Sequence, residues 1–210
     1  MKSYLISEAI GDIAGSAYEG RTRRIKDYDK VKLFSSRAHF TDDTVLTFAC
    51  AEAFIDKKDM TMNLWKCANE HRHAGFGSKF KLWMASHNPQ PYRSLGNGSA
   101  MRCSSAGWLA QTEDECVCMA HETAAPTHNH PEGFKGAEAT ALTIFHLKNG
   151  KDKDFVREHI LDKYYPDWSN KKYADIHDSY TFYSTCAGTV GPAIICFLES
   201  EDYVDCIKLA

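Results

Sequence analysis

The sequence lacks the features of a membrane, secreted or disulfide-stabilised protein. It has no apolar run approaching the ~20 residues of a membrane-spanning helix, and its start runs into Glu8 and Asp12 without the apolar segment of a secretory signal. None of its 8 cysteines forms a Cys-x-x-Cys pair, and several stand among apolar neighbours. We therefore expect a cytoplasmic protein with reduced, buried thiols and no membrane partner.

The sequence also lacks basic excess and strand-like patterning. A net charge of -3 argues against a duplex nucleic-acid partner, since such proteins usually carry a basic patch. Strict alternation of apolar and polar residues is nearly absent. With 210 residues, of which 43% are hydrophobic and 25% charged, the chain is long enough for one domain over residues 1–210, expected to be a monomer.

Apolar residues instead recur at helical spacing, which predicts an all-α fold. The stripes are Ala9, Ile10, Ile13, Ala14 and Ala17; Val45, Leu46, Ala49 and Ala53; Phe134, Ala137, Ala141, Ile144 and Phe145; and Phe155, Val156, His159 and Ile160. Residues 190–198 are apolar nearly all round, as in a central helix. Polar loops are expected over residues 21–39, 75–99 and 121–132.

Two short segments carry carboxylates beside small or hydroxylated residues. In the first, Gly-Asp-Ile-Ala-Gly at residues 11–15, small residues favour close helix packing, but Asp12 lies in an apolar stripe, where a carboxylate needs a partner. The second is Thr-Asp-Asp-Thr at residues 41–44. Taken alone it favours a capped helix start, with acids at the positive end of the helix dipole. The alternative is a Mg²⁺ site, because this ion prefers carboxylate and hydroxyl oxygens.

Two further segments contain glycine and histidine. Gly-Asn-Gly-Ser-Ala-Met-Arg at residues 96–102 predicts either a tight turn before a helix or a backbone cradle for an anion, with free N–H groups and Arg102 close by. Residues 127–132 predict a polar loop ahead of the Phe134 helix. His128 and His130 have the spacing of a zinc pair, but no second pair stands at a suitable distance. The alternative is a histidine that bonds to or stacks on a ligand.

In this order, these segments resemble the motifs of the ADP-ribosylglycohydrolase family. The resemblance covers nearly the whole chain and includes Gly-Phe-Gly at residues 75–77 and the apolar stretch 189–198. The feature that is specific to this family is the combination of Thr-Asp-Asp-Thr with Gly-Asn-Gly-x-x-Met-Arg. The resemblance implies an all-α, orthogonal helical bundle with a dinuclear Mg²⁺ centre. It also implies an enzyme that hydrolyses N- or O-glycosidic bonds and so removes ADP-ribose from modified proteins or small ADP-ribose conjugates.

The resemblance also assigns roles to individual residues. Thr41, Asp42 and Asp43 fall on the family's first metal-binding motif, and Glu19 or Asp43 becomes the catalytic acid–base group. The implied substrate-binding residues are Gly75, Gly77, Ser94, Gly96, Asn97, Gly98 and His128. Arginine-linked, serine-linked and O-acyl substrates all occur in the family, and these motifs do not separate them.

One family motif does not occur in the sequence. The Gly-Gly-Asp-x-Asp-Thr segment that supplies the remaining metal ligands is expected just after Ala210. Ser200 is expected to cap a last helix with Val204 and Ile207 on its apolar face, so the predicted bundle lacks the family's last helices. For residues 1–210 we therefore expect weak Mg²⁺ binding and little hydrolysis. The alternative function is a catalytically impaired fragment, or a non-catalytic ADP-ribose-binding or structural relative.

Overall fold

The computed structural model describes residues 2–19, 25–181 and 183–210. These residues form helices and no strand; one isolated bridge pairs Gly96 with Thr185. The predicted all-α class is confirmed. The elements in chain order are α1 (Lys2–Ser16), η1 (Tyr28–Lys30), α2 (Asp42–Asp56), α3 (Met60–Glu70), α4 (Ser78–Ala85), α5 (Gly98–Met101), α6 (Ser104–Leu109), α7 (Glu113–His128), α8 (Pro131–Lys148), α9 (Lys153–Val156), η2 (Arg157–Leu161), α10 (Asp162–Tyr164), α11 (Pro166–Ser169), α12 (Tyr173–His177), α13 (Cys186–Glu199) and α14 (Tyr203–Leu209).

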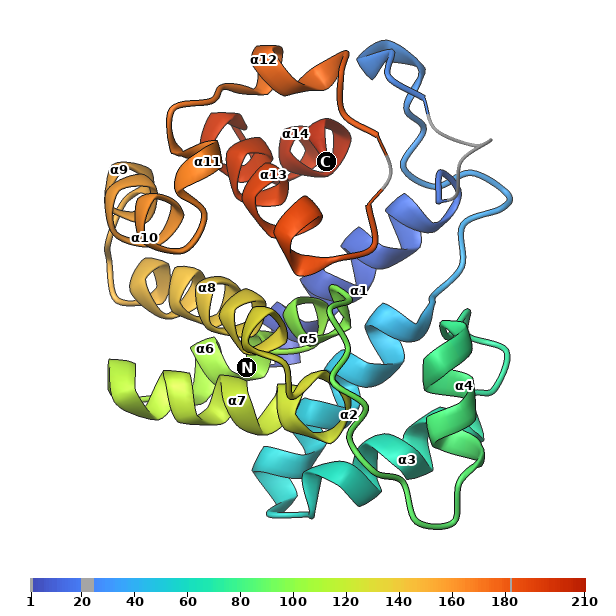
Figure 1. The fold of residues 1–210 in the computed structure, drawn as a ribbon. Coiled ribbons are helices and arrows are strands. Elements are labelled where there is room, and N and C mark those ends of the chain that lie inside the picture. Colours follow the sequence, from blue (N-terminus) through green and yellow to red (C-terminus); the bar gives the residue numbers. More distant parts are fainter. Residues whose placement is uncertain (1, 20–24, 182) are drawn as a thin grey trace.

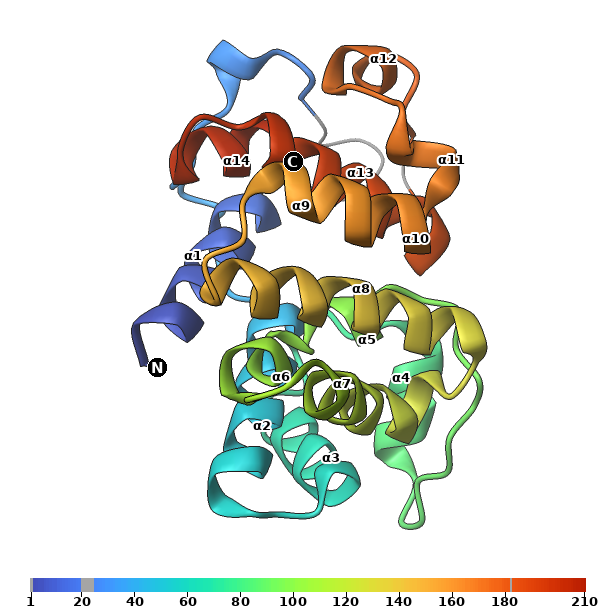
Figure 2. The ribbon, with the colours of Figure 1, turned by 90° about the vertical axis from the view of Figure 1, so that its left-hand side faces the viewer.

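Helix α8 lies in the middle of the fold, with α6 and α7 on one side and α9, α10 and α13 on the other (Figures 1 and 2). Its start is set by His130, whose ring caps the helix, and by Pro131 in the first turn, where a missing N–H costs nothing. It ends as predicted at Asn149, followed by Gly150 with φ 82°. Against α8, a Cβ added to Gly107 would meet a backbone oxygen at 2.5 Å, so only glycine permits this close approach of α6.

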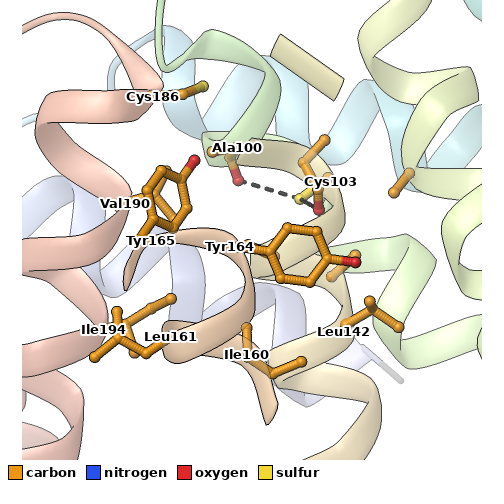
Figure 3. Packing of buried hydrophobic residues seen from close by; sticks show 14 of the residues in the cluster. Ala100, Cys103, Leu142, Ile160, Leu161, Tyr164, Tyr165, Cys186, Val190 and Ile194 are labelled. Atoms are coloured by element: carbon orange, nitrogen blue, oxygen red, sulfur yellow. Dashed lines mark hydrogen bonds between the residues drawn. The ribbon is translucent and has the colours of Figure 1, made fainter. Parts of the chain in front are cut away.

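Two apolar clusters hold the helices together. The larger one surrounds α8 and joins it to α6, α7, η2 and α13, as Figure 3 shows for Leu142, Leu161 and Ile194. The second one joins α2, α3 and α4 around Leu46, Leu64 and residues of the 76–84 segment. Each fully buried leucine or isoleucine contributes about 1.5–3 kcal/mol relative to exposure. The predicted stripes at residues 45–53 and 134–145 thus face the two clusters.

The predicted apolar helix at residues 190–198 is α13, which begins earlier than expected. Thr185 caps its start by accepting the N–H of Gly188. Pro192 inside the helix has no N–H to donate to the carbonyl of Gly188. The Tyr180 hydroxyl donates to that carbonyl instead, at 2.9 Å, so the interruption of the helix ladder leaves no unpaired acceptor there.

Three sequence-based expectations of local structure are wrong. Residues 121–128 belong to α7, which begins at the Thr112 cap with an acidic first turn and continues past Pro126 to His128. The expected loop 75–99 contains α4. Ser200 ends α13 and does not begin the next helix; Asp202 caps α14 by accepting the N–H of Asp205 at 2.8 Å.

Among the helices described, none combines the length and the apolar character needed to cross a bilayer.

Candidate functional site

The end of α1 is bonded to the start of α2 through one carboxylate. Asp12 accepts the N–H of Thr41 and its hydroxyl, each at 2.7 Å, and the N–H of Thr44 at 3.2 Å; the Thr44 hydroxyl also donates to it. Thr41 is 3% exposed and caps α2, as predicted, by accepting the N–H of Asp43. The partner that a carboxylate in an apolar stripe requires is therefore the start of α2.

The carboxylates beside this junction form a group that we call the acidic cluster: Asp12, Glu19, Asp42 and Asp43. Carboxylate oxygens of Asp12, Glu19 and Asp43 lie within 4.8 Å of one another. Burial raises the pKa of Asp43 to about 7, and the charges of Asp42 and Asp12 add to this effect. Burial likewise raises the pKa of Asp42 to about 6, with Glu19 and Asp12 acting in the same direction. The cluster is thus short of positive charge.

The donor set of the acidic cluster fits a divalent cation. Two carboxylates with raised pKa values, Asp42 and Asp43, lie beside a hydroxyl and offer the oxygen ligands that Mg²⁺ prefers, and a cation would relieve the repulsion within the cluster. Asp12 differs from the others because one of its oxygens already accepts three hydrogen bonds. Asp42, Asp43 and the Thr41 hydroxyl oxygen are the groups that would hold the ion, and a carboxylate oxygen of Glu19 lies within 4.8 Å of one of Asp43.

The two glycines of the 75–77 segment differ in backbone conformation and in surroundings. Gly75 has φ +101°, a backbone conformation that L side chains rarely adopt. A Cβ there would lie 3.4 Å from the Asp42 carboxylate, so Gly75 lies against the acidic cluster. Gly77 precedes α4 in extended backbone, and a Cβ on it would meet nothing within 4 Å. The structure therefore brings Gly75 to the acidic cluster and gives no steric reason for glycine at position 77.

The second part of the candidate site is residues 94–98, which we call the glycine loop. The N–H of Ser94 donates to the carbonyl of Thr127 at 3.1 Å, and the Ser94 hydroxyl accepts the N–H of Gly96 at 3.1 Å. The N–H of Asn97 donates to the carbonyl of Ser184 at 2.9 Å. The expectation of a cradle of free N–H groups is therefore wrong for Gly96 and Asn97, because these two amides fix the shape of the loop.

His128 closes the glycine loop from the side of α7. It is the last residue of that helix, it is 4% exposed, and its Nδ1 lies 2.7 Å from the Thr127 hydroxyl. A Cβ on Gly98 would lie 3.0 Å from Nε2, and one on Gly96 would lie 3.3 Å from it. Burial lowers the pKa of His128 to about 3, and the charge of Arg102 acts in the same direction. The imidazole is therefore neutral at physiological pH and lies with Nε2 against the loop.

Arg102 does not lie where the sequence interpretation placed it. Its side chain is 0% exposed, and Nε and Nη2 both donate to the carbonyl of Thr123, at 2.9 and 2.7 Å. The guanidinium thus binds the C-terminal part of α7, where the helix dipole favours a cation. It is not an exposed ligand for an anion at the glycine loop.

The two parts of the site are joined through α2 and α5. The Thr47 hydroxyl, one turn after the acidic cluster, donates to the carbonyl of Met101 at 3.1 Å. Met101 ends α5, which begins at Gly98 in the glycine loop. Figure 1 shows α5 beside the N-terminal half of α2. The geometry therefore combines a cation-binding acidic cluster with a rigid loop in neighbouring parts of the fold.

The sequence interpretation missed two kinds of residue. Asp12 and Thr44 received no role, although an acid within an apolar stripe was the signal for the first. Thr127 was counted as part of a polar loop, and only the extension of α7 places its hydroxyl between Arg102 and His128.

Comparison with known proteins gives the same classification over the whole chain. The sequence model of the family described as ADP-ribosylglycohydrolase matches residues 1–210. Among solved structures, one described as an ADP-ribosylglycohydrolase-related protein complex is similar in fold, with a TM-score of 0.76 and 17% identity. The similarity covers 98% of this chain and 77% of that one. The chain belongs to the ADP-ribosylglycohydrolase family.

Proposed function

We propose that this protein is a Mg²⁺-dependent hydrolase that removes ADP-ribose from modified protein side chains or small ADP-ribose conjugates. The observation that supports this most directly is the acidic cluster, in which three carboxylates lie within 4.8 Å of one another. Family membership supplies the reaction class. In this reaction a water oxygen bonds to the anomeric carbon, the bond to the leaving group breaks, and the leaving group takes up a proton.

Thr41, Asp42 and Asp43 would hold the cation. When bound, Mg²⁺ supplies positive charge that orients ribose hydroxyls and acidifies a ligand water. A carboxylate that binds a cation stays ionised, which leaves Asp43 unsuited to carrying the proton that is transferred. Of the two candidates for acid–base catalysis, Glu19 is the better one. It is exposed, and its carboxylate lies within 4.8 Å of those of Asp12 and Asp43.

The glycine loop and His128 would bind the ADP-ribose. The loop is held by bonds from Ser94, Thr127 and Ser184, so it changes little on binding and the ordering cost is low. The neutral imidazole of His128 offers one N–H to the ligand without the cost of burying a charge.

The activity test is release of free ADP-ribose from arginine-linked, serine-linked and O-acyl conjugates, with Mg²⁺ or EDTA. Release by residues 1–210 is expected to be slow, to need Mg²⁺ and to be lost in Asp43→Asn. Asp56→Asn is the matched control, because Asp56 ends the same helix as an exposed partner of Lys58. If ADP-ribose binds but no conjugate is cleaved, the protein is a non-catalytic binding member of the family. If ADP-ribose does not bind either, the proposed function is wrong.

Asn97→Ala is expected to weaken ADP-ribose binding about tenfold. The Asn97 side chain makes no capping bond to α5, so it is available to a ligand at the loop, and losing one such polar contact costs roughly 1–3 kcal/mol. Titration calorimetry with ADP-ribose measures the change. Asn170→Ala is the control, because Asn170 is an exposed asparagine at the end of α11. Equal affinities in the two variants would contradict a binding role for Asn97.

A further inference from the structure

Three side chains form a hydrogen-bonded line from the core to the glycine loop. Nη2 of the buried Arg102 lies 2.8 Å from the Thr127 hydroxyl oxygen, and that oxygen lies 2.7 Å from Nδ1 of His128. Thr127 is 0% exposed, like Arg102. Neither Arg102 nor Thr127 has a role in the proposed reaction.

The chemistry of Arg102 determines which group donates and which accepts in each of these hydrogen bonds. A guanidinium carries only donors, so the Thr127 oxygen accepts from Nη2, and the hydroxyl proton needs an acceptor of its own. Among the described residues, Nδ1 of His128 is the one other side-chain atom within hydrogen-bond distance of that oxygen. If Nδ1 carried a proton, the buried hydroxyl proton would have no acceptor, at a cost of roughly 1–3 kcal/mol. Nδ1 is therefore the acceptor.

The remaining proton of the ring then lies on Nε2. A neutral imidazole has one N–H, and burial together with the Arg102 charge keeps His128 neutral, with a pKa of about 3. Nε2 has no hydrogen-bond partner within the described part of the chain, and it is not among the fully buried atoms that lack one. It lies against Gly96 and Gly98, at 3.3 and 3.0 Å from the Cβ positions of these glycines.

We propose that Arg102 and Thr127 are positioning residues that fix His128 as the Nε2–H tautomer, so that the ring offers a hydrogen-bond donor to an oxygen of the ligand at the glycine loop. In this tautomer Nε2 has no lone pair, so it is neither a base nor a metal ligand. The ligand group that fits is an oxygen acceptor of a phosphate or a ribose. The assignment of the tautomer depends on the protein's own contacts, and only the identity of the ligand rests on the proposed function.

The direct test is the protonation of the two ring nitrogens, read from the ¹⁵N chemical shifts of His128 in the free wild-type protein. We expect Nε2 protonated and Nδ1 unprotonated at every pH from 5 to 8. Thr127→Ser keeps the hydroxyl and is expected to give the same spectrum. Thr127→Val keeps the shape but not the hydroxyl, and is expected to give a mixture of the two tautomers. A protonated Nδ1 in the wild type would overturn the proposal.

Binding of ADP-ribose provides the second measurement. Thr127→Val is expected to raise Kd about tenfold, the equivalent of 1.4 kcal/mol, while Thr127→Ser stays near the wild type. If Thr127→Val leaves both the spectrum and Kd unchanged, Thr127 has no positioning role. If that variant does not fold, the wild-type and Thr127→Ser spectra decide. A wild type that shows the expected tautomer but binds no ADP-ribose would refute the proposed function and leave the tautomer assignment standing.

Discussion

Replacing Asp12 by alanine is expected to lower the free energy of unfolding by about 3 kcal/mol and to abolish cation binding at the acidic cluster. The Asp12 carboxylate accepts the N–H and hydroxyl groups of both Thr41 and Thr44, so its loss leaves three donors at the start of α2 without an acceptor and leaves the Thr41 hydroxyl only the Asp43 carboxylate, at 3.3 Å. Hydrogen bonds to a charged group contribute about 1.5–3 kcal/mol each, but water replaces part of this at a partly buried site. Urea unfolding measures the stability.

The effect on the cation comes through Thr41. Because the Thr41 hydroxyl donates its proton to Asp12, the lone pairs of its oxygen are left for other contacts, one of which is the N–H of Asp43. Loss of Asp12 lets this hydroxyl donate to the Asp43 carboxylate instead, 3.3 Å away, so the Thr41 oxygen no longer presents the same lone pairs beside Asp42 and Asp43. Calorimetry with Mn²⁺ measures the binding independently of activity.

A double-mutant cycle separates this contact from general damage to the fold. Asp12→Ala and Thr44→Val are combined, and the coupling energy is expected to be about 1–2 kcal/mol because the two side chains bond directly. Additive effects of the two changes would mean that the contact contributes no stability. Mn²⁺ binding that survives in folded Asp12→Ala would contradict the positioning of Thr41.

Helices whose apolar residues recur along one face were predictable from the sequence. The stripe at residues 134–145 and the Asn149–Gly150 stop give α8 and its end, because burial and capping act locally. The error at residues 121–128 has a tertiary cause. The polar residues Thr123, Thr127 and His128 resemble a loop in sequence. Inside the core, however, the Arg102 side chain donates to the carbonyl of Thr123 and to the hydroxyl of Thr127, and that hydroxyl is bonded in turn to His128.

The candidate site was predictable only in its motifs. Thr41, Asp42 and Asp43 lie together at the capped start of α2, and Gly75 lies against Asp42; the roles that the family resemblance implies for these residues stay predictions. The sequence interpretation could not distinguish Asp12 as a carboxylate that orients Thr41 from one that binds a cation. That distinction depends on which donors reach each oxygen, and these donors are 29 and 32 residues away along the chain.

The second large expected effect is a gain of stability in Asp43→Asn. At pH 8 in EDTA, the variant is expected to unfold with a free energy about 2 kcal/mol higher than the wild type. Burial and the charges of Asp42 and Asp12 raise the pKa of Asp43 to about 7 in the folded protein, against about 3.9 in an unfolded chain. At pH 8 the wild type must therefore keep a charge at a site that disfavours it. The amide removes this charge but is itself still buried, so only part of the penalty is recovered.

The stability difference between the wild type and Asp43→Asn is expected to depend on pH. Between about pH 4 and pH 7 the folded wild type binds the Asp43 proton and the unfolded chain does not, so its stability falls as the pH rises through this window. The variant lacks this titration. The difference between the two proteins should therefore be small at pH 4, grow up to pH 7 and stay constant above it. The contribution of His128, which has the opposite slope, is present in both proteins and cancels.

Mg²⁺ is expected to reverse the order of stability. A cation that binds only the folded protein stabilises it by about 2.7 kcal/mol at 100 times its Kd, and Asp43 is one of the groups proposed to hold it. In saturating Mg²⁺ the wild type should therefore be the more stable protein, while Asp43→Asn gains little. Thermal unfolding of both proteins at pH 8, in EDTA and in Mg²⁺, measures all four stabilities. If the variant is no more stable than the wild type in EDTA, the repulsion within the acidic cluster is already neutralised by the protein itself, and the cluster has no electrostatic need for a cation.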